Sequence, residues 1–171
     1  DAWARLPPRR NERATGRRWP LDVQVAGPLA PLRAALAARG WQVQPQARWL
    51  DVLRLLGDDR ARAAQPVLPA TLGAEAEVLL MRRPGPRPDQ LQVLHLWRAP
   101  ARLDDGSPLW VGSAQAMRYT RPLGIVGLWQ PAMDGGRASA AMRADLEGLP
   151  LRIGTRGGIV VVRVDARGNR P

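Results

Sequence analysis

His95 has the side chain best suited to catalysis, and it is the single histidine among 171 residues. The sequence has no cysteine, so a two-histidine zinc motif, a Cys-based metal site and a thiol nucleophile are all excluded. His95 stands between Leu94 and Leu96 in an apolar run, and strand alternation places it on the same face as Val93 and Trp97. This setting favours a packed or hydrogen-bonded structural histidine over a general base.

Two pairs of adjacent carboxylates, Asp58-Asp59 and Asp104-Asp105, offer the oxygen ligands that divalent cations prefer. Each pair falls at an expected turn or helix exit, where a solvated turn is the simpler explanation. The glycine-rich segment 154–158 lacks phosphate-loop spacing and precedes strand-like sequence, so we interpret it as a turn. No serine lies in a Gly-x-Ser-x-Gly elbow. The sequence therefore predicts no catalytic residue, metal or cofactor.

Residues 1–20 form a basic arm in which six arginines lie between or beside Trp3 and Trp19, against two acidic residues. Pro7 and Pro8 prevent a helix there. One interpretation is a solvated linker. The other is a juxtamembrane segment, because Trp favours the membrane interface and clustered Arg attracts anionic headgroups. The residues expected to contact lipid or another anion are Arg9, Arg10, Arg13, Arg17, Arg18 and Trp19.

The whole chain is basic, with a formal charge of +11 carried by 26 arginines and no lysine. Such a field favours anionic partners, namely phospholipid headgroups, nucleic acid or acidic protein. The apolar share of 45% and charged share of 24% indicate a folded domain. Seven tryptophans supply nearly all the large rings, and each indole N–H needs an acceptor when buried. No run of about 18 apolar residues is present, so the chain does not span a membrane by itself.

Hydrophobic periodicity predicts one domain over residues 21–171. Strands are expected over 21–25, 41–44, 75–82, 91–98 and 109–116, with a closing hairpin over 151–155 and 159–164. Helices are expected over 29–39, 47–56 and 137–146. Segment 58–73 is predicted to be a loop, and 118–136 a loop or edge strand. The fold class is therefore α+β, a mixed, mainly antiparallel sheet with two or three packed helices.

Five blocks of this sequence resemble a known family in their order and approximate spacing. They are residues 20–27, Leu36 with Gly40-Trp41, residues 80–83, residues 94–98 and residues 109–114. The chain resembles the LssY C-terminal-like domain, which is found attached to bacterial membrane proteins of the DedA and type 2 phosphatidic acid phosphatase classes. The resemblance implies membrane association but transfers no active-site residue. Many members of the family have histidines after the strand that corresponds to residues 109–114, whereas segment 119–136 of this chain has none.

These observations lead to one expectation and two alternatives. The first is a non-catalytic accessory or binding domain of a bacterial inner-membrane protein, contacting anionic lipid and a membrane-spanning region of the same or a neighbouring protein. A free periplasmic protein is the alternative location. The second function is a cryptic phosphoester hydrolase that uses His95 with Asp104 or Asp105. The third is a nucleic-acid-binding domain, because arginines neutralise phosphates while rings stack on bases.

Overall fold

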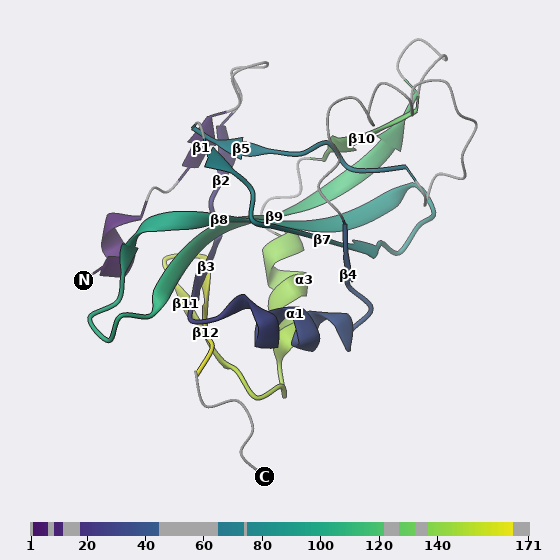
Figure 1. Ribbon diagram of the computed structural model, residues 1–171. Helices are drawn as coiled ribbons and strands as arrows, with labels where there is room; N and C mark the ends of the chain where they lie inside the picture. The colour runs from purple at the N-terminus through teal and green to yellow at the C-terminus, as the bar shows by residue number, and fades with distance from the viewer. Residues whose placement is uncertain are drawn as a thin grey trace.

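The computed structural model describes residues 2–6, 9–11, 18–44, 65–73, 75–121, 127–132 and 137–165. Its centre is an eight-stranded sheet built around two 13-residue strands, β8 (Gln90–Arg102) and β9 (Pro108–Thr120). These two strands form the long hairpin that crosses the middle of Figure 1. Because both strands are long, their residues contribute to every part of the sheet from one end of the hairpin to the other.

The strand order is β11-β12-β3-β9-β8-β7-β4, and β10 also pairs with β9. Strand β3 runs parallel to β12, and the other neighbours in this sheet run antiparallel. Two small two-stranded sheets, β1-β2 and β5-β6, lie outside it. The remaining strands are β1 (Arg9–Asn11), β2 (Arg18–Pro20), β3 (Val23–Ala26), β4 (Gln42–Val43), β5 (Thr71–Leu72), β6 (Glu75–Ala76), β7 (Leu79–Pro84), β10 (Leu128–Pro131), β11 (Arg152–Arg156) and β12 (Ile159–Arg163).

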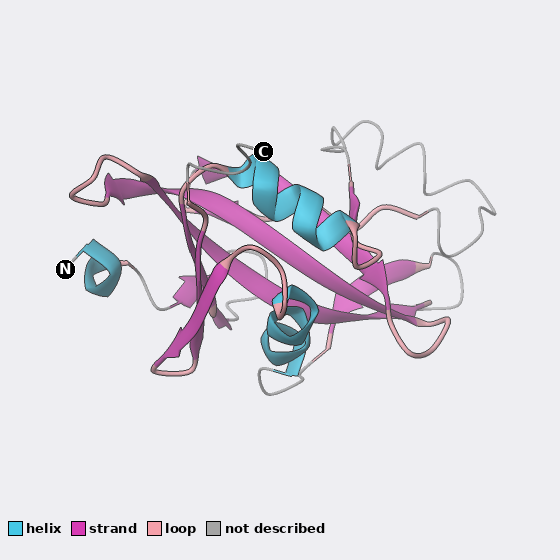
Figure 2. Cartoon of the chain, turned by 90° about the horizontal axis from the view of Figure 1, so that it is seen from below, coloured by secondary structure: helices cyan, strands magenta, loops and turns pink. Residues whose placement is uncertain are grey.

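Two α-helices among the described residues, α1 (Leu29–Ala37) and α3 (Arg137–Leu146), cover one face of the sheet, as Figure 2 shows. Each helix presents an apolar stripe at helical spacing: Leu32 and Leu36 on α1, and Met142 and Leu146 on α3. These side chains form one buried cluster with alternate residues of the strands. We call this face of the sheet the helix face.

The opposite face carries two further apolar clusters. One contains Trp97 and Leu109 and includes Ala2 and Leu6 from the chain start, where residues Ala2–Arg5 form the 3-10 helix η1. The other is built around Val93 and includes Val67, Leu80, Leu91, Met117 and Trp129. Segment 65–72 therefore packs on the far side of the sheet from the helices. We call this face the open face.

One edge of β9 is shared by two strands. Strand β3 pairs with residues 109–112 of β9 and β10 with residues 117–120. Between them the Ala114 N–H donates to Asp22 Oδ1 at 2.9 Å. The Asp22 carboxylate thus takes the place of a strand carbonyl and satisfies a buried donor that no neighbouring strand reaches.

Most predicted elements are confirmed, including helix 137–146, the antiparallel order of the three middle strands and the closing hairpin. The two long strands extend beyond the predicted 91–98 and 109–116, because pairing continues to the Asp104-Asp105 turn. The predicted strand 75–82 is instead two strands, β6 and β7, separated by Glu77 and Val78. The predicted loop 58–73 ends in a strand, β5, and segment 118–136 contains the edge strand β10.

Other predictions fall where the structure is not described. The predicted helix 47–56 lies outside the described residues. The arm boundary at residue 20 stays a prediction, although Ala2 and Leu6 pack against the sheet. No helix in the described part is long and apolar enough to cross a membrane.

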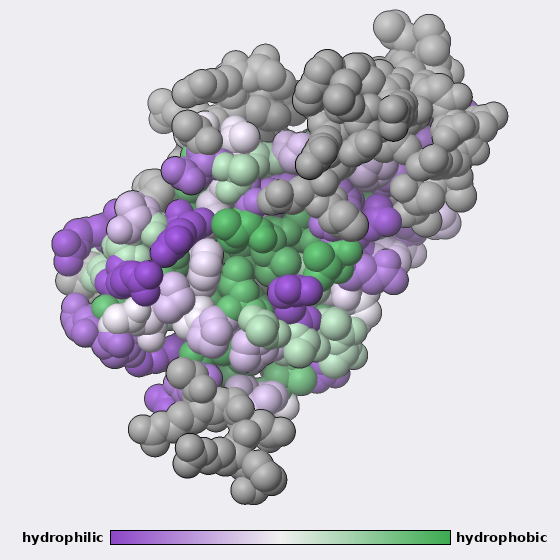
Figure 3. Space-filling view, in the orientation of Figure 1, coloured by the Kyte–Doolittle hydropathy of each residue, from purple (hydrophilic) through white to green (hydrophobic). Residues whose placement is uncertain are grey.

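The described surface has few large exposed apolar side chains, namely Val43, Leu68 and Val78. Figure 3 shows apolar residues gathered in the middle of the face seen in Figure 1, with hydrophilic residues around them. Singly exposed apolar residues of this kind are normal for a folded domain and do not by themselves indicate a partner.

Candidate functional site

A band of buried polar side chains crosses the open face between its two apolar clusters. On β8, His95 lies between Val93 and Trp97, as the alternation predicted. On β9, Ser113 and Gln115 occupy the equivalent stretch. The members, all buried, are Gln24, Glu77, His95, Ser113 and Gln115. We call this set the polar band, and it is the densest group of buried functional side chains in the described part of the chain.

Glu77 and His95 form the centre of the polar band. The His95 Nδ1 lies 2.6 Å from Glu77 Oε2, and both residues are only 2% exposed. Pairing of Leu80 with His95 places the start of β7 beside β8, so Glu77, just before β7, reaches the ring. The His95 ring also stacks on Trp97, with centroids 5.7 Å apart. A carboxylate at Nδ1 fixes the orientation of an imidazole and leaves Nε2 as its other polar atom.

Ser113 is the cross-strand partner of His95. Its Oγ accepts a hydrogen bond from Gln115 Nε2 at 3.1 Å, and the residue is 0% exposed. An acid, a histidine and a serine thus follow one another across neighbouring strands, the order that serves nucleophilic catalysis when the serine is accessible. Here the serine is enclosed, and its hydrogen bond is to Gln115 on its own strand.

Sequence reasoning missed Glu77, because it treated this acidic residue as part of a continuous strand. The hydrolase hypothesis paired His95 with Asp104 or Asp105, and the structure does not bring these residues together. Asp105 lies in the β8–β9 turn, where its Oδ1 accepts from the Ser107 N–H at 2.9 Å and its Oδ2 lies 2.6 Å from Arg163 Nη2. The hydrogen bond from the Ser107 backbone is the main cause that lowers the pKa of Asp105.

The glycine-rich segment and the second carboxylate pair were the other candidate sites in the sequence. Segment 154–158, predicted to be a turn, is a turn only at its end: residues 154–156 belong to β11 and pair with β12. Gly157 and Gly158 join the two strands with φ of 56° and 81°, a conformation that favours glycine. Asp58-Asp59 lies outside the described residues. Within the described ranges, no three His, Cys, Asp or Glu side chains are grouped to hold a metal ion.

The basic arm contains a β-hairpin. Strands β1 and β2 pair antiparallel, with Arg9 opposite Pro20, Arg10 opposite Trp19 and Asn11 opposite Arg18. We call β1 and β2 the arginine hairpin. It lies on the opposite side of the sheet from α1 and α3 (Figure 1). Four of the six residues predicted to contact an anion are thereby brought together, while Arg13 and Arg17 lie outside the described residues.

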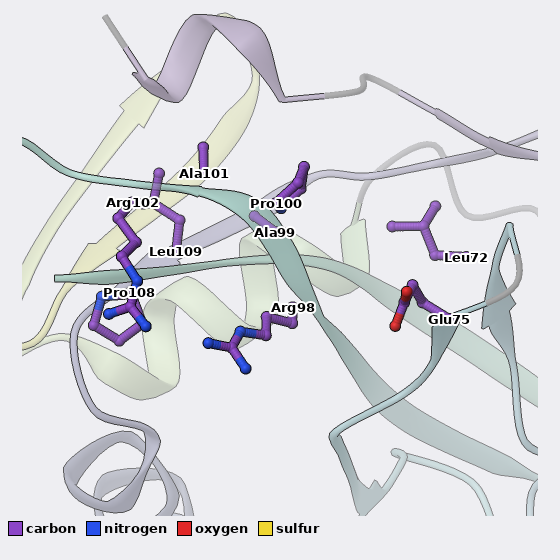
Figure 4. Close-up of a pocket in the computed structure, with 9 residues that line it drawn as sticks. All are labelled: Leu72, Glu75, Arg98, Ala99, Pro100, Ala101, Arg102, Pro108 and Leu109. Carbon is purple, nitrogen blue, oxygen red and sulfur yellow. The ribbon is translucent and has the colours of Figure 1, made fainter. Parts of the chain in front are cut away.

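A groove of about 380 Å³ lies beside the far half of β8, where β7 no longer pairs with it. Figure 4 shows Arg98 and Arg102 at one end, with Pro108 beside Arg102, and Glu75 at the other. Arg102 donates to the Gly106 carbonyl at 3.1 Å. A carboxylate, that of Glu75, shares this lining with the two arginines and opposes their attraction for an anion.

The fold and site define a sheet-dominated α+β domain with an enclosed acid–histidine pair and a basic hairpin. The chain belongs to the LssY C-terminus family, whose model matches residues 3–121. The match includes the arginine hairpin and ends at Arg121, directly after β9. No curated protein and no solved structure matches the chain.

Proposed function

We propose that this chain is a non-catalytic accessory domain of a bacterial inner-membrane protein, and that its arginine hairpin contacts anionic lipid. Its protein partner in this proposal is a membrane-spanning region of the same or a neighbouring polypeptide. The observation that carries the proposal is the pairing of β1 with β2, which gathers Arg9, Arg10 and Arg18 with Trp19.

The dimensions of the hairpin support a joint action of its arginines. Each strand has three residues, so at roughly 3.3 Å per residue the backbone positions lie within about 10 Å. By strand alternation Arg9 and Arg18 lie on one face of the hairpin, and Arg10 and Trp19 on the other. The Debye length at 0.1 M salt is also about 10 Å, so charges on both faces contribute to the attraction for one patch of headgroups. The single Trp19 adds a residue type that favours the membrane interface.

The enclosed polar band supports the non-catalytic part of the proposal. A catalytic histidine and serine need a route to substrate, whereas His95 and Ser113 are buried. Glu77 further holds the ring through a 2.6 Å contact. These features are typical of a buried hydrogen-bonded pair that specifies strand packing.

Vesicle co-sedimentation with matched charge variants tests the lipid contact. The triple variant Arg9→Gln, Arg10→Gln, Arg18→Gln removes three charges from the arginine hairpin. The control removes three exposed charges from α1 and α3 on the helix face: Arg33→Gln, Arg137→Gln and Arg143→Gln. Glutamine has a helix propensity close to that of arginine, so the control keeps its helices. Each variant loses three charges, so the two have the same net charge.

The two variants should differ in binding to vesicles that contain phosphatidylglycerol. Each cationic side chain near an anionic surface contributes about 1 kcal/mol, so the hairpin variant should lose on the order of 100-fold in partition coefficient. The control should lose clearly less. Equal losses in the two variants would show that only the overall charge matters. If the wild type binds neutral phosphatidylcholine vesicles as well as phosphatidylglycerol vesicles, an electrostatic contact with lipid is excluded.

A second candidate function, a phosphoester hydrolase that uses His95, is favoured by one observation, the contact of Glu77 with its Nδ1. In this mechanism Glu77 orients the ring and Nε2 removes a proton from the nucleophile. Turnover of a phosphomonoester and of a phospholipid by the wild-type chain, His95→Ala and Glu77→Gln tests it. Activity that disappears in both variants supports a hydrolase, whereas no turnover, or turnover that survives His95→Ala, removes this candidate.

A further inference from the structure

A second groove, of about 690 Å³, lies on the open face where β4, β7, β8 and β10 meet. Arg82 from β7, Leu91 from β8 and Trp129 from β10 line it, and Gln42 and the proline-rich turn between β7 and β8 complete it. We call it the Trp129 groove. It is separate from the arginine hairpin and from the groove in Figure 4, and its volume suits a small organic molecule.

Arg82 brings a positive charge to this groove, and the described residues place no carboxylate against it. Its Nη1 donates to the Gln65 carbonyl at 2.9 Å, and within the described residues no acidic side chain lies in ion-pair distance. Burial lowers the pKa of Arg82, but a guanidinium stays charged at neutral pH. The next residue, Arg83, points to the helix face and is matched by Asp145 at 2.5 Å. Among the described residues, therefore, Arg83 has a carboxylate partner and Arg82 has a carbonyl partner.

Trp129 brings a hydrogen-bond donor without an acceptor. The residue is 4% exposed, and its Nε1 has no partner in the described part of the chain. Trp41 and Trp110, by comparison, donate to Asp145 Oδ2 at 2.9 Å and to the Gly27 carbonyl at 2.8 Å. Buried indole N–H groups ordinarily find an acceptor, so the lining of this groove contains a donor that is unmet.

The two groups require the same kind of ligand atom. A guanidinium and an indole N–H are both donors, and an oxyanion accepts from both. The other wall is mainly apolar, formed by Leu91, the Trp129 ring and the prolines Pro84, Pro86 and Pro88. It also contains Gln90 and a second arginine, Arg87, whose Nε lies 3.8 Å from Asp89 Oδ1. We propose that the Trp129 groove binds an amphiphilic organic anion, with its phosphate or carboxylate on Arg82 and Trp129 Nε1 and its apolar body against Leu91 and the turn prolines.

This inference concerns a single bound molecule and does not depend on the lipid contact of the arginine hairpin. It is tested by titrating the ¹⁵N-labelled chain with small probes and following the indole N–H signals of its seven tryptophans. The probes are phenyl phosphate and benzoate, with benzyl alcohol as the neutral analogue and inorganic phosphate as the head group alone. The indole signal of Trp129 is assigned by its disappearance in Trp129→Phe.

Phenyl phosphate, benzoate or both should move the Trp129 signal, while those of Trp41 and Trp110 stay in place. Affinity should fall at least about tenfold in Arg82→Gln and in Trp129→Phe, because each loses a charge-assisted hydrogen bond. Arg33→Gln, on α1, is the matched control and should bind as the wild type does. Trp129→Phe keeps an aromatic ring, and the six remaining indole signals report whether it is folded.

Several results would overturn the proposal. One is a Trp129 signal that no anionic probe moves. If benzyl alcohol binds as tightly as the anionic probes, the oxyanion does not contribute to affinity. If inorganic phosphate binds as tightly as phenyl phosphate, the apolar body does not contribute. Undiminished binding by a folded Trp129→Phe variant would remove the indole contact.

Discussion

Replacing His95 with leucine removes one half of a buried pair and should destabilise the domain strongly. His95 and Glu77 are each 2% exposed and lie 2.6 Å apart. Removing one member of a buried pair leaves the other in a low-dielectric interior and typically costs about 3–5 kcal/mol. The lost stacking on Trp97 adds about 0.5–1.5 kcal/mol.

A change of this size is measurable against the total stability of a domain, about 5–15 kcal/mol. The assay is urea unfolding followed by tryptophan fluorescence, which gives the free energy of unfolding directly. For a chain of this length, a loss of 3–5 kcal/mol lowers the Tm by about 6–20 °C. Glu77→Gln, which keeps a carbonyl near the imidazole N–H, should cost only about 1–2 kcal/mol.

The double variant His95→Leu with Glu77→Met tests whether the two residues stabilise the fold as a pair or independently of each other. Well-packed apolar residues often replace a buried pair at little cost, so the double variant should be more stable than His95→Leu alone. A loss below about 1 kcal/mol in His95→Leu would refute the reasoning. With Glu77→Met measured as the second single variant, a double variant whose loss equals the sum of the two single losses would refute the coupling between the two residues.

Two further predictions concern other parts of the sheet and its turns. Gly112→Ala should lower the free energy of unfolding by about 1–3 kcal/mol in the same urea assay, because its Cβ would lie 2.4 Å from the buried Leu96 Cδ2; unchanged stability would contradict this packing. Asp105 should titrate by NMR below its ordinary value of 3.8, mainly because the Ser107 backbone donates to it. Its contribution to stability is present above the unfolded-state pKa and is lost as the pH falls through the lowered folded-state pKa. Ser107→Ala, which deletes the side-chain hydrogen bond and keeps the backbone one, should raise the midpoint only in part, and a wild-type midpoint at or above 3.8 would be contrary to the structure.

Much of the sheet could be predicted from local sequence. Alternation along β8 and β9 predicted their faces, including the placement of His95 with Val93 and Trp97. Apolar spacing and glycine stops predicted α1, and helix 137–146 was predicted with the bounds that α3 has. These signals are local, since each depends on residues within one element.

The remaining features depend on contacts between distant segments. The parallel pairing of β3 with β12 joins the first and last strands of the main sheet, and no local pattern specifies it. Glu77 becomes the partner of His95 only through the β7–β8 register. Trp129 lies in a segment whose glycines and prolines obscured the edge strand β10, so the Trp129 groove could not be found from sequence.

The proposed function is tested most directly by the partition of the wild-type chain and the arginine hairpin triple variant onto phosphatidylglycerol vesicles at low and high salt. The wild type should bind strongly at roughly 0.1 M salt, and the variant should lose most of this binding. The difference between them should disappear near 1 M salt, where the Debye length falls to about 3 Å. Equal binding of the two proteins at low salt, or a difference that high salt leaves unchanged, would contradict a lipid contact through the arginine hairpin.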